Sequence, residues 1–123
     1  MPYPPKSFPL RSSSFKFALK GILIFINEER HALVHAIATM IAASAGIYYR
    51  ISNAEWIMIV IACAMVWISE FFNSCIERTV DVISPQRNAK AGAIKDMAAG
   101  AVLIASIAAF IIALIIFIPK ITI

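Results

Sequence analysis

The order of apolar and polar residues divides the chain into one segment of mixed character followed by three long apolar segments. The apolar segments cover residues 32–49, 56–76 and 97–118. Each approaches the roughly 20 apolar residues that a helix needs to cross the hydrocarbon core of a bilayer. Because lipid offers the backbone no hydrogen-bond partners, an open chain crosses it only as helices. The pattern therefore predicts an all-α membrane protein with three transmembrane helices.

The segment of mixed character, residues 13–29, has apolar residues that are interrupted by Lys16 and Lys20. Such a pattern favours an amphipathic helix that lies in the membrane interface rather than across the bilayer. A first spanning helix is the alternative for the same residues. Residues 1–12 contain four prolines and no apolar run of the kind found in signal peptides. We expect them to form a flexible cytoplasmic tail, and residues 13–120 to form one domain.

The basic residues are distributed unevenly around the apolar segments. Nine of the 11 lysines and arginines precede the first segment or lie between the second and the third, whereas Arg50 and Lys120 lie on the other side. An excess of positive charge marks the cytoplasmic side of a membrane protein. We therefore expect the N-terminus and the connecting segment of residues 77–96 to lie in the cytoplasm.

Composition supports a membrane protein and limits what else the chain can be. Hydrophobic residues make up 61% of the 123 residues, whereas soluble domains are close to half apolar. A chain of this length forms one domain with a small core, so oligomerisation is expected. The net charge of +4 comes from basic residues at the ends of apolar segments, where they would meet anionic lipid head groups and not nucleic acid. The two cysteines have no metal-ligand or disulfide spacing, and the four glycines form no phosphate-binding loop.

The acidic residues are more informative about function than the basic residues. Glu70 lies within the second apolar segment, where an ionised carboxylate is costly unless it is paired or bound to a metal, so it indicates a functional site. The residues Glu70, Asn73, Glu77 and Asp81 are spaced at i, i+3, i+7 and i+11. On a helix they share one face about 80° wide. The alternative is an ordinary solvated helix face, which explains Asp81 well but leaves Glu70 unexplained.

A divalent metal ion is the expected physical reason for carboxylates on one face. Like charges at this spacing repel each other unless a cation lies between them. Mg²⁺ prefers oxygen ligands, usually one or two carboxylates together with the phosphates of a substrate. Glu28 and Glu29 end the interfacial helix on the same side of the membrane, and Lys95 and Asp96 begin the third span there. We therefore expect these groups to meet at one site, whereas His35, alone on an apolar helix, is expected to be a hydrogen-bonded packing residue.

Two stretches of the sequence resemble a known family. The first is EFFNSCIERTVDVISP, which begins at Glu70 and is followed after a short loop by AKAGAIKDMAAGAV, which ends at Val102. The second is FKFALKGILIFINEER, residues 15–30. Both are similar to signatures of the prokaryotic diacylglycerol kinase family, which includes the undecaprenol kinases of Gram-positive bacteria. The similarity covers residues 13–120, and an alignment without a gap makes Glu29 the glutamate of the family's first-helix motif.

The resemblance implies an ATP-dependent lipid kinase in the inner membrane of a bacterial cell, built as a homotrimer whose active sites are shared between protomers. The substrate would be a membrane lipid alcohol, either diacylglycerol or undecaprenol, with ATP as co-substrate and Mg²⁺ as cofactor. By position, Glu70 would be the general base, and Glu29 and Glu77 would be the metal ligands. The nucleotide would contact Phe17, Glu29, Glu77, Asp81, Gln86, Arg87, Asn88, Lys95 and Asp96, and the lipid would contact Glu70, Asn73 and Ala99.

Two other functions fit part of the pattern. A small multispan transporter or channel subunit could use Glu70 as an ion or proton site. Transport sites usually lie near the middle of the bilayer, however, whereas most charged groups here gather at one face. A membrane subunit without enzymatic activity would leave the long signature from Glu70 to Val102 unexplained.

Overall fold

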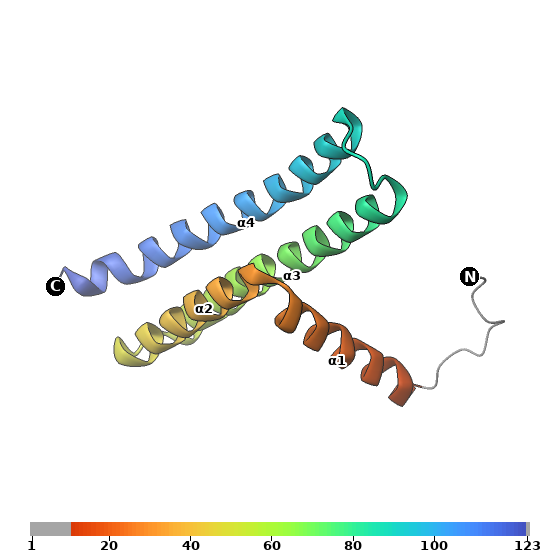
Figure 1. Cartoon of the computed structure of the whole chain (residues 1–123). Helices are drawn as coiled ribbons and strands as arrows, with labels where there is room; N and C mark the ends of the chain where they lie inside the picture. The colour runs from red at the N-terminus through yellow and green to blue at the C-terminus, as the bar shows by residue number, and fades with distance from the viewer. Residues whose placement is uncertain (1–10, 123) are drawn as a thin grey trace.

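A computed structural model describes residues 11–122 of the chain as four helices joined by short connections (Figure 1). The helices are α1 (Arg11–Glu28), α2 (Arg30–Tyr48), α3 (Asn53–Ile83) and α4 (Ala89–Ile121). Of the predicted flexible tail, residues 1–10 lie outside the described residues, and Arg11 already belongs to α1. The predicted all-α architecture is confirmed.

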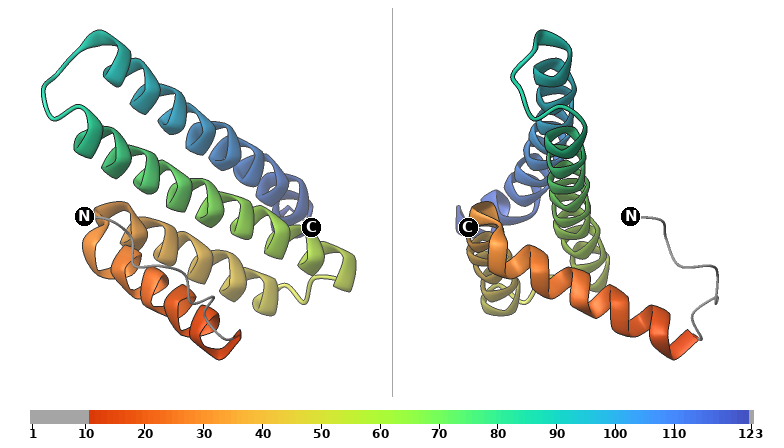
Figure 2. Two further views of the ribbon diagram at one scale, coloured as in Figure 1. Left: turned by 90° about the vertical axis from the view of Figure 1, so that its right-hand side faces the viewer. Right: turned by 45° about the vertical axis from the view of Figure 1, so that its right-hand side comes forward.

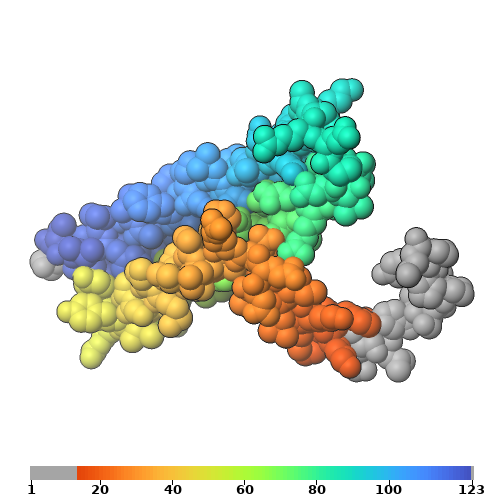
Figure 3. Space-filling model, viewed as in Figure 1, coloured from red at the N-terminus to blue at the C-terminus, as the bar shows by residue number. Residues whose placement is uncertain are grey.

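Three of the helices in this part of the chain, α2, α3 and α4, are long and apolar enough to cross a membrane. They correspond to the three predicted spans, and α1 is not among them. The three lie side by side, with neighbours in the sequence running antiparallel, whereas α1 projects away as a separate arm (Figure 2). In the space-filling view the arm joins the bundle where α2 begins (Figure 3). The chain is therefore a multi-pass membrane protein, and the interfacial position of α1 stays a prediction.

The arm leaves the bundle because the backbone is extended at one residue. Glu29 has φ −98° and ψ 121°, outside the helical region, so it separates the last residue of α1 from the first residue of α2. The chain therefore changes direction at Glu29, which is one of the two predicted metal ligands. The side chain of Glu29 is consequently presented at the corner between the arm and the bundle.

Helices α3 and α4 are longer than the predicted spans. They have 31 and 33 residues, and at 1.5 Å per residue they extend over about 46 and 50 Å, which exceeds the ~30 Å hydrocarbon core. Only residues 84–88 of the predicted connecting segment 77–96 lie outside helices. Helix α3 ends at Ile83 because Ser84 precedes Pro85, and a residue before proline avoids the α-helical region. Most of the polar segment thus belongs to α3 and α4 and lengthens both helices beyond their apolar parts.

The turn between α2 and α3 lies at the opposite end of the bundle. Arg50 has φ 52°, the left-handed conformation in which a helix commonly ends. Its N–H group donates to the carbonyl of Ile47 at 3.3 Å, and the N–H of Ile51 donates to the carbonyl of Gly46 at 3.2 Å. This pair of hydrogen bonds is the Schellman arrangement, which satisfies the last carbonyl groups of α2.

Further contacts stabilise this end of the bundle. Ser52 and Glu55 form a capping box at the start of α3, in which each side chain binds the backbone N–H of the other residue. The second carboxylate oxygen of Glu55 lies 2.8 Å from Nζ of Lys120 near the end of α4. The two basic residues that the sequence sets apart, Arg50 and Lys120, therefore lie at the same end of the bundle, far from the loop of residues 84–88 (Figure 1).

The interior of the bundle is small, and its main apolar cluster lies near the α2–α3 turn. Ile51, Ile59 and Ile116 form this cluster, with Trp56 packed against it. Many other large apolar side chains are exposed, and Ile104 on α4 is 73% exposed. Apolar surface of this extent is expected where helices face lipid or other helices in a membrane.

Candidate active site

Four polar side chains on α3 lie at the spacing that the sequence predicts. They are Glu70, Asn73, Glu77 and Asp81, and one uninterrupted helix bears all of them. Their burial decreases along the helix: Glu70 is only 6% exposed, the next two are partly buried, and Asp81 is exposed. The row therefore leads from the interior of the bundle to the end at which α3 meets the loop of residues 84–88.

Glu70 lies in the interior between α3 and α2. Its Oε1 atom is 3.8 Å from Nε2 of His35 on α2. Its other carboxylate oxygen, Oε2, is buried and has no hydrogen-bond partner among residues 11–122. A buried polar atom without a partner costs about 1–3 kcal/mol, and more when it is charged. An atom left in this state in a native fold calls for an explanation, and a bound ligand is one.

Three aromatic rings join α1 to α3 at the level of Glu70. Phe25 on α1 is buried and stacks on Phe71, with the ring centroids 4.0 Å apart. It also meets Trp67 edge-on, with the centroids 6.1 Å apart. Trp67 and Phe71 lie one turn before and one residue after Glu70 on α3. The last turn of the arm is therefore held against α3 beside the buried carboxylate.

Asn73 connects the buried part of the row to the exposed part. Its Nδ2 atom donates to Oε1 of Glu77 at 3.4 Å, which orients that carboxylate. Its Oδ1 atom is buried and, in the described part of the chain, has no hydrogen-bond partner. Asn73 also lines a groove of about 500 Å³ between α3 and α4. One amide thus orients a predicted metal ligand and keeps an oxygen available for a ligand.

Arg78 links the arm to α3, and the sequence did not identify it. Its guanidinium lies 2.9 Å from Oε2 of Glu28 and 3.2 Å from Oε1 of Glu29. Arg78 directly follows Glu77, so the structure brings the corner between α1 and α2 to the same level of α3 as that carboxylate. A basic residue directly after Glu77, between two acidic members of the row, was the available signal, but its partners lie 49 residues or more away along the chain.

The loop end of the site is ordered by the first turns of α4. Lys95 Nζ forms an ion pair with Asp81, across the loop from α4 to α3. Asn88 caps α4, because its Oδ1 accepts from the N–H of Ala91 at 2.8 Å. Its Nδ2 donates to Oγ of Ser84 at 2.6 Å. The side chain of Asn88, which the resemblance assigns to the nucleotide, is thus already used to close the loop.

The remaining predicted site residues are exposed and lie on three elements. Phe17 is on α1, Gln86 and Arg87 are in the loop, and Asp96 and Ala99 are on α4. Within residues 11–122, the side chains of this group form no hydrogen bond or ion pair with the row on α3. Their assignment to nucleotide or lipid stays a prediction.

The donor atoms at this end suit a metal ion that is shared with phosphate groups. Among residues 11–122, no group of three or more histidine, cysteine, aspartate or glutamate side chains is arranged as a complete metal site. Mg²⁺ does not need such a group, because it is usually held by one or two carboxylates together with phosphates and water. Glu29 and Glu77 offer hard oxygen ligands of the required kind. The residues fit Mg²⁺ bound to a nucleotide better than an ion bound by protein alone.

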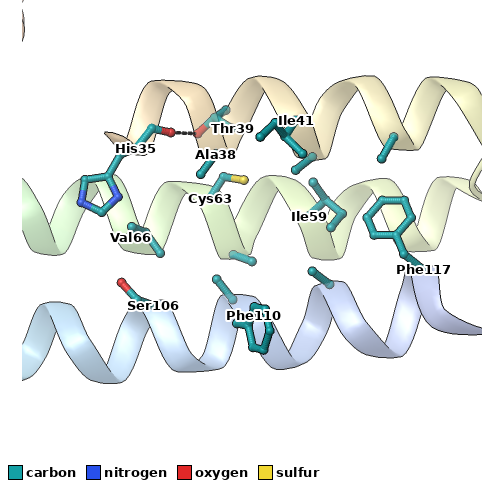
Figure 4. A pocket seen from close by; sticks show the side chains of 15 residues that line it. His35, Ala38, Thr39, Ile41, Ile59, Cys63, Val66, Ser106, Phe110 and Phe117 are labelled. Carbon is teal, nitrogen blue, oxygen red and sulfur yellow. Dashed lines mark hydrogen bonds between the residues drawn. The ribbon is translucent and has the colours of Figure 1, made fainter. Parts of the chain in front are cut away.

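An apolar groove of about 490 Å³ runs between α2, α3 and α4 (Figure 4). It begins at His35 and Thr39, and Phe117 lies at its other end. Alanine side chains from all three helices form much of its wall, together with Ile59 and Val66. The polar end of the groove therefore lies beside Glu70, and the rest of its length is suited to a hydrocarbon chain.

Comparisons with known proteins place the chain among small membrane enzymes. A family model described as prokaryotic diacylglycerol kinase matches residues 16–117. The undecaprenol kinase of Bacillus subtilis (strain 168) is 36% identical over 107 residues, which cover 87% of this chain and 87% of the relative. The residues matched by the family model include every predicted site residue from Phe17 to Ala99.

Proposed function

Since the chain belongs to the prokaryotic diacylglycerol kinase family and is a lipid kinase, we propose that it transfers the γ-phosphate of Mg-ATP to the hydroxyl group of a membrane lipid alcohol. The observation that supports this reaction best is the position of Glu70. Its carboxylate is buried, one oxygen has no partner among the described residues, and the polar end of an apolar groove lies beside it. A lipid alcohol has the complementary form, with one hydroxyl at the end of a long apolar chain.

In the proposed reaction Glu70 is the general base. Phosphoryl transfer depends on alignment of the reacting atoms and on neutralisation of charge more than on covalent catalysis. Glu70 accepts the hydroxyl proton while the hydroxyl oxygen attacks the γ-phosphorus. Asn73 orients Glu77 through its amide and contacts the substrate through Oδ1. We assign no further protein group to the proton transfer itself.

The proposed metal ligands are Glu29 and Glu77. A bound Mg²⁺ supplies neutralisation of charge on the β- and γ-phosphates. The side chains of Arg78 and Asn73 hold these two carboxylates in place, at 3.2 and 3.4 Å respectively. Two observations support the assignment. Both side chains offer carboxylate oxygens, which Mg²⁺ prefers, and Arg78, the residue after Glu77 on α3, contacts Glu29.

The proposed nucleotide site lies at the loop end of the bundle. Lys95 and Asp96 are in the second turn of α4, and Lys95 is already directed toward Asp81 on α3. Arg87 is exposed in the adjacent loop, where its positive charge suits phosphate. The remaining assigned contacts, from Phe17, Gln86 and Asn88, rest on the family resemblance alone.

We propose undecaprenol as the preferred lipid and diacylglycerol as the second candidate. The groove is a single apolar path from His35 to Phe117, and its α2 wall from His35 to Ala45 is about 15 Å long. An isoprenoid alcohol has one chain behind its hydroxyl, whereas diacylglycerol has two chains on adjacent carbons. A single path favours the single chain, and the relative from Bacillus subtilis is named an undecaprenol kinase. We propose Ala99 on α4 as a further contact to the lipid.

The proposed assembly is a homotrimer in the bacterial inner membrane, with the N-terminus and the loop of residues 84–88 in the cytoplasm. The uneven distribution of basic residues supports this orientation. The small core and the extensive exposed apolar surface support association of several chains. We propose that α1 lies in the membrane interface at the cytoplasmic side.

The experiment that tests the function is a kinase assay in mixed micelles with Mg-ATP, in which undecaprenol and diacylglycerol are supplied in parallel. Glu70→Gln should lower turnover at least about 100-fold, the usual contribution of a general base. The matched control is Glu55→Gln, the same change at the other end of α3, where glutamine can keep the capping box. Absence of phosphorylation of both lipids, or full turnover in Glu70→Gln, would refute the proposed function.

A further inference from the structure

His35 is the one titratable side chain of α2 that faces Glu70. The exposed fractions of the two side chains are 16% and 7%, and Nε2 lies 3.8 Å from Oε1. The sequence predicted a hydrogen-bonded packing histidine at this position. The structure places it between Glu70 on α3 and the polar end of the apolar groove, whose lining His35 joins (Figure 4). An imidazole beside a buried carboxylate has a polar role that packing alone does not explain.

The relative position of His35 and Glu70 is fixed by a second contact between the same helices. Trp67 on α3 donates from Nε1 to Oγ1 of Thr39 on α2 at 2.9 Å. Thr39 in turn donates from Oγ1 to the carbonyl of His35 at 2.7 Å. The rings of Trp67 and His35 have their centroids 6.2 Å apart. Because Trp67 is three residues before Glu70, this contact sets the register of α2 against α3 at the level of the carboxylate.

We propose that His35 is a positioning residue for Glu70, and this inference rests on the proposed role of Glu70 as the base. Nε2–H of His35 donates to Oε1, which turns the other oxygen, Oε2, toward the hydroxyl of the lipid. The distance of 3.8 Å is longer than a hydrogen bond. Hydrogen bonds of catalytic groups are often long without substrate and shorten in the complex. A base that is oriented by a second side chain is a recurring arrangement in enzymes.

The phosphoryl transfer that His35 supports needs only the lipid alcohol and ATP as reactants. The hydroxyl oxygen of the lipid forms a bond to the γ-phosphorus, and the bond from that phosphorus to the bridging oxygen of ATP breaks. The electron pair of the broken bond leaves with ADP. The hydroxyl proton passes to Oε2 of Glu70, while the hydrogen bond from His35 to Oε1 keeps the carboxylate in its orientation.

The location of His35 at the polar end of the groove suits a role in orienting the carboxylate of Glu70 toward the lipid hydroxyl. Val66 lies near His35 in the groove, and Ile41 lies further along it (Figure 4). In the proposed complex the lipid chain occupies this groove, and its hydroxyl approaches Glu70 from the side on which His35 lies. A carboxylate turned about its side-chain bonds would present the wrong oxygen to the hydroxyl. Misplacement of a reacting group by a small distance lowers the rate strongly, because the effective concentration of aligned groups is lost.

Kinetics of His35→Leu and His35→Gln separate positioning from packing. Leucine suits an apolar groove, so a packing role predicts full activity for His35→Leu. Positioning predicts that kcat falls about 10- to 100-fold, the equivalent of one hydrogen bond to a charged group, with KM for ATP unchanged. Glutamine places an amide N–H close to the position of Nε2, so His35→Gln should retain most of kcat. The matched control, His31→Leu, changes an exposed histidine one turn earlier and should leave turnover unchanged.

A second measurement does not require turnover and compares the wild-type chain with Glu70→Gln. In a ¹H–¹⁵N spectrum of histidine-labelled protein in micelles, Glu70→Gln should shift the Nε2 resonance of His35 and leave that of His31 in place. If the kinase assay fails but the shift is present, the contact stands and the proposed function falls. Four results would overturn the role of His35. Three are kinetic: full turnover in a folded His35→Leu, equal losses of kcat in the leucine and glutamine variants, or a loss confined to KM for the lipid. The fourth is an unshifted Nε2 resonance of His35 in Glu70→Gln.

Discussion

Replacing Gly46 by alanine adds one methyl group at a close contact between α2 and α3. The added Cβ would lie 2.5 Å from Cη2 and 2.8 Å from Cζ2 of Trp56, and 3.1 Å from Cδ1 of Ile51. Carbon atoms in van der Waals contact are about 3.5–4.0 Å apart, so a shift of about 1 Å is required. The indole cannot move freely, because Trp56 packs against the buried cluster that includes Ile51. Either α2 moves away from α3, or Trp56 leaves its place.

The expected loss of stability follows from two opposing contributions. Insertion of a methyl group into a packed interior costs about 1–3 kcal/mol, and a contact of 2.5 Å belongs at the upper end of that range. Alanine is favoured over glycine within a helix by about 1 kcal/mol, which offsets part of this cost. The net destabilisation of Gly46→Ala is therefore about 2 kcal/mol, or about 30-fold in the unfolding equilibrium.

The measurement is the free energy of unfolding in mixed micelles titrated with SDS, followed by far-UV circular dichroism at one fixed protein concentration. The matched controls are Gly21→Ala and Gly100→Ala, since an added Cβ at either position meets nothing within 4 Å. These controls should be as stable as the wild type or slightly more stable. In Trp56→Leu, the further change Gly46→Ala should cost little. If Gly46→Ala alone is as stable as the wild type, the indole moves aside freely and the packing argument is wrong.

Three other changes test the proposed site. Glu77→Ala should raise the Mg²⁺ concentration for half-maximal turnover at least about 10-fold, as loss of one carboxylate ligand predicts, and an unchanged requirement would remove Glu77 from the metal. Arg78→Gln should lower kcat through loss of the link to Glu29, measured at saturating Mg-ATP, and unchanged kcat would make this ion pair incidental. Ala113→Phe, which fills the groove, should raise KM for the lipid and leave KM for ATP unaltered, whereas equal effects on both substrates would place the lipid elsewhere.

The three spans could be predicted because length and apolarity are properties of a contiguous segment. The true ends of α3 and α4 could not be read from the same property. Both helices continue past the apolar segments into polar sequence, where Pro85 ends α3 and the cap at Asn88 begins α4. The residue in the left-handed conformation at the end of α2 is Arg50, whereas a glycine is the usual sequence signal for such a helix end. Sequence patterns report such ends poorly when the residue is atypical.

The polar row on α3 could be predicted because all its members belong to one helix, whose geometry fixes their relative directions. The contacts of this row with other helices could not be predicted in the same way. The pairing of Glu70 with His35 depends on the register of α2 against α3, which Thr39 and Trp67 set. The pairing of Arg78 with Glu29 depends on a break in the helix between α1 and α2 that no proline or glycine marks.

The two ends of the bundle differ in a way that suits a kinase in a membrane. The end near Arg50 contains the buried isoleucine cluster, the capping box and the ion pair between Glu55 and Lys120, so the side chains of Ser52, Glu55 and Lys120 all have partners within the chain. The other end contains the buried oxygens of Glu70 and Asn73 that lack partners among residues 11–122. Unsatisfied groups of this kind lower stability and are kept where a ligand completes them. Since contacts at the Arg50 end stabilise the fold, the other end can retain polar groups directed at substrates. A substitution such as Gly46→Ala should therefore lower the free energy of unfolding while leaving the turnover of the folded molecules unchanged.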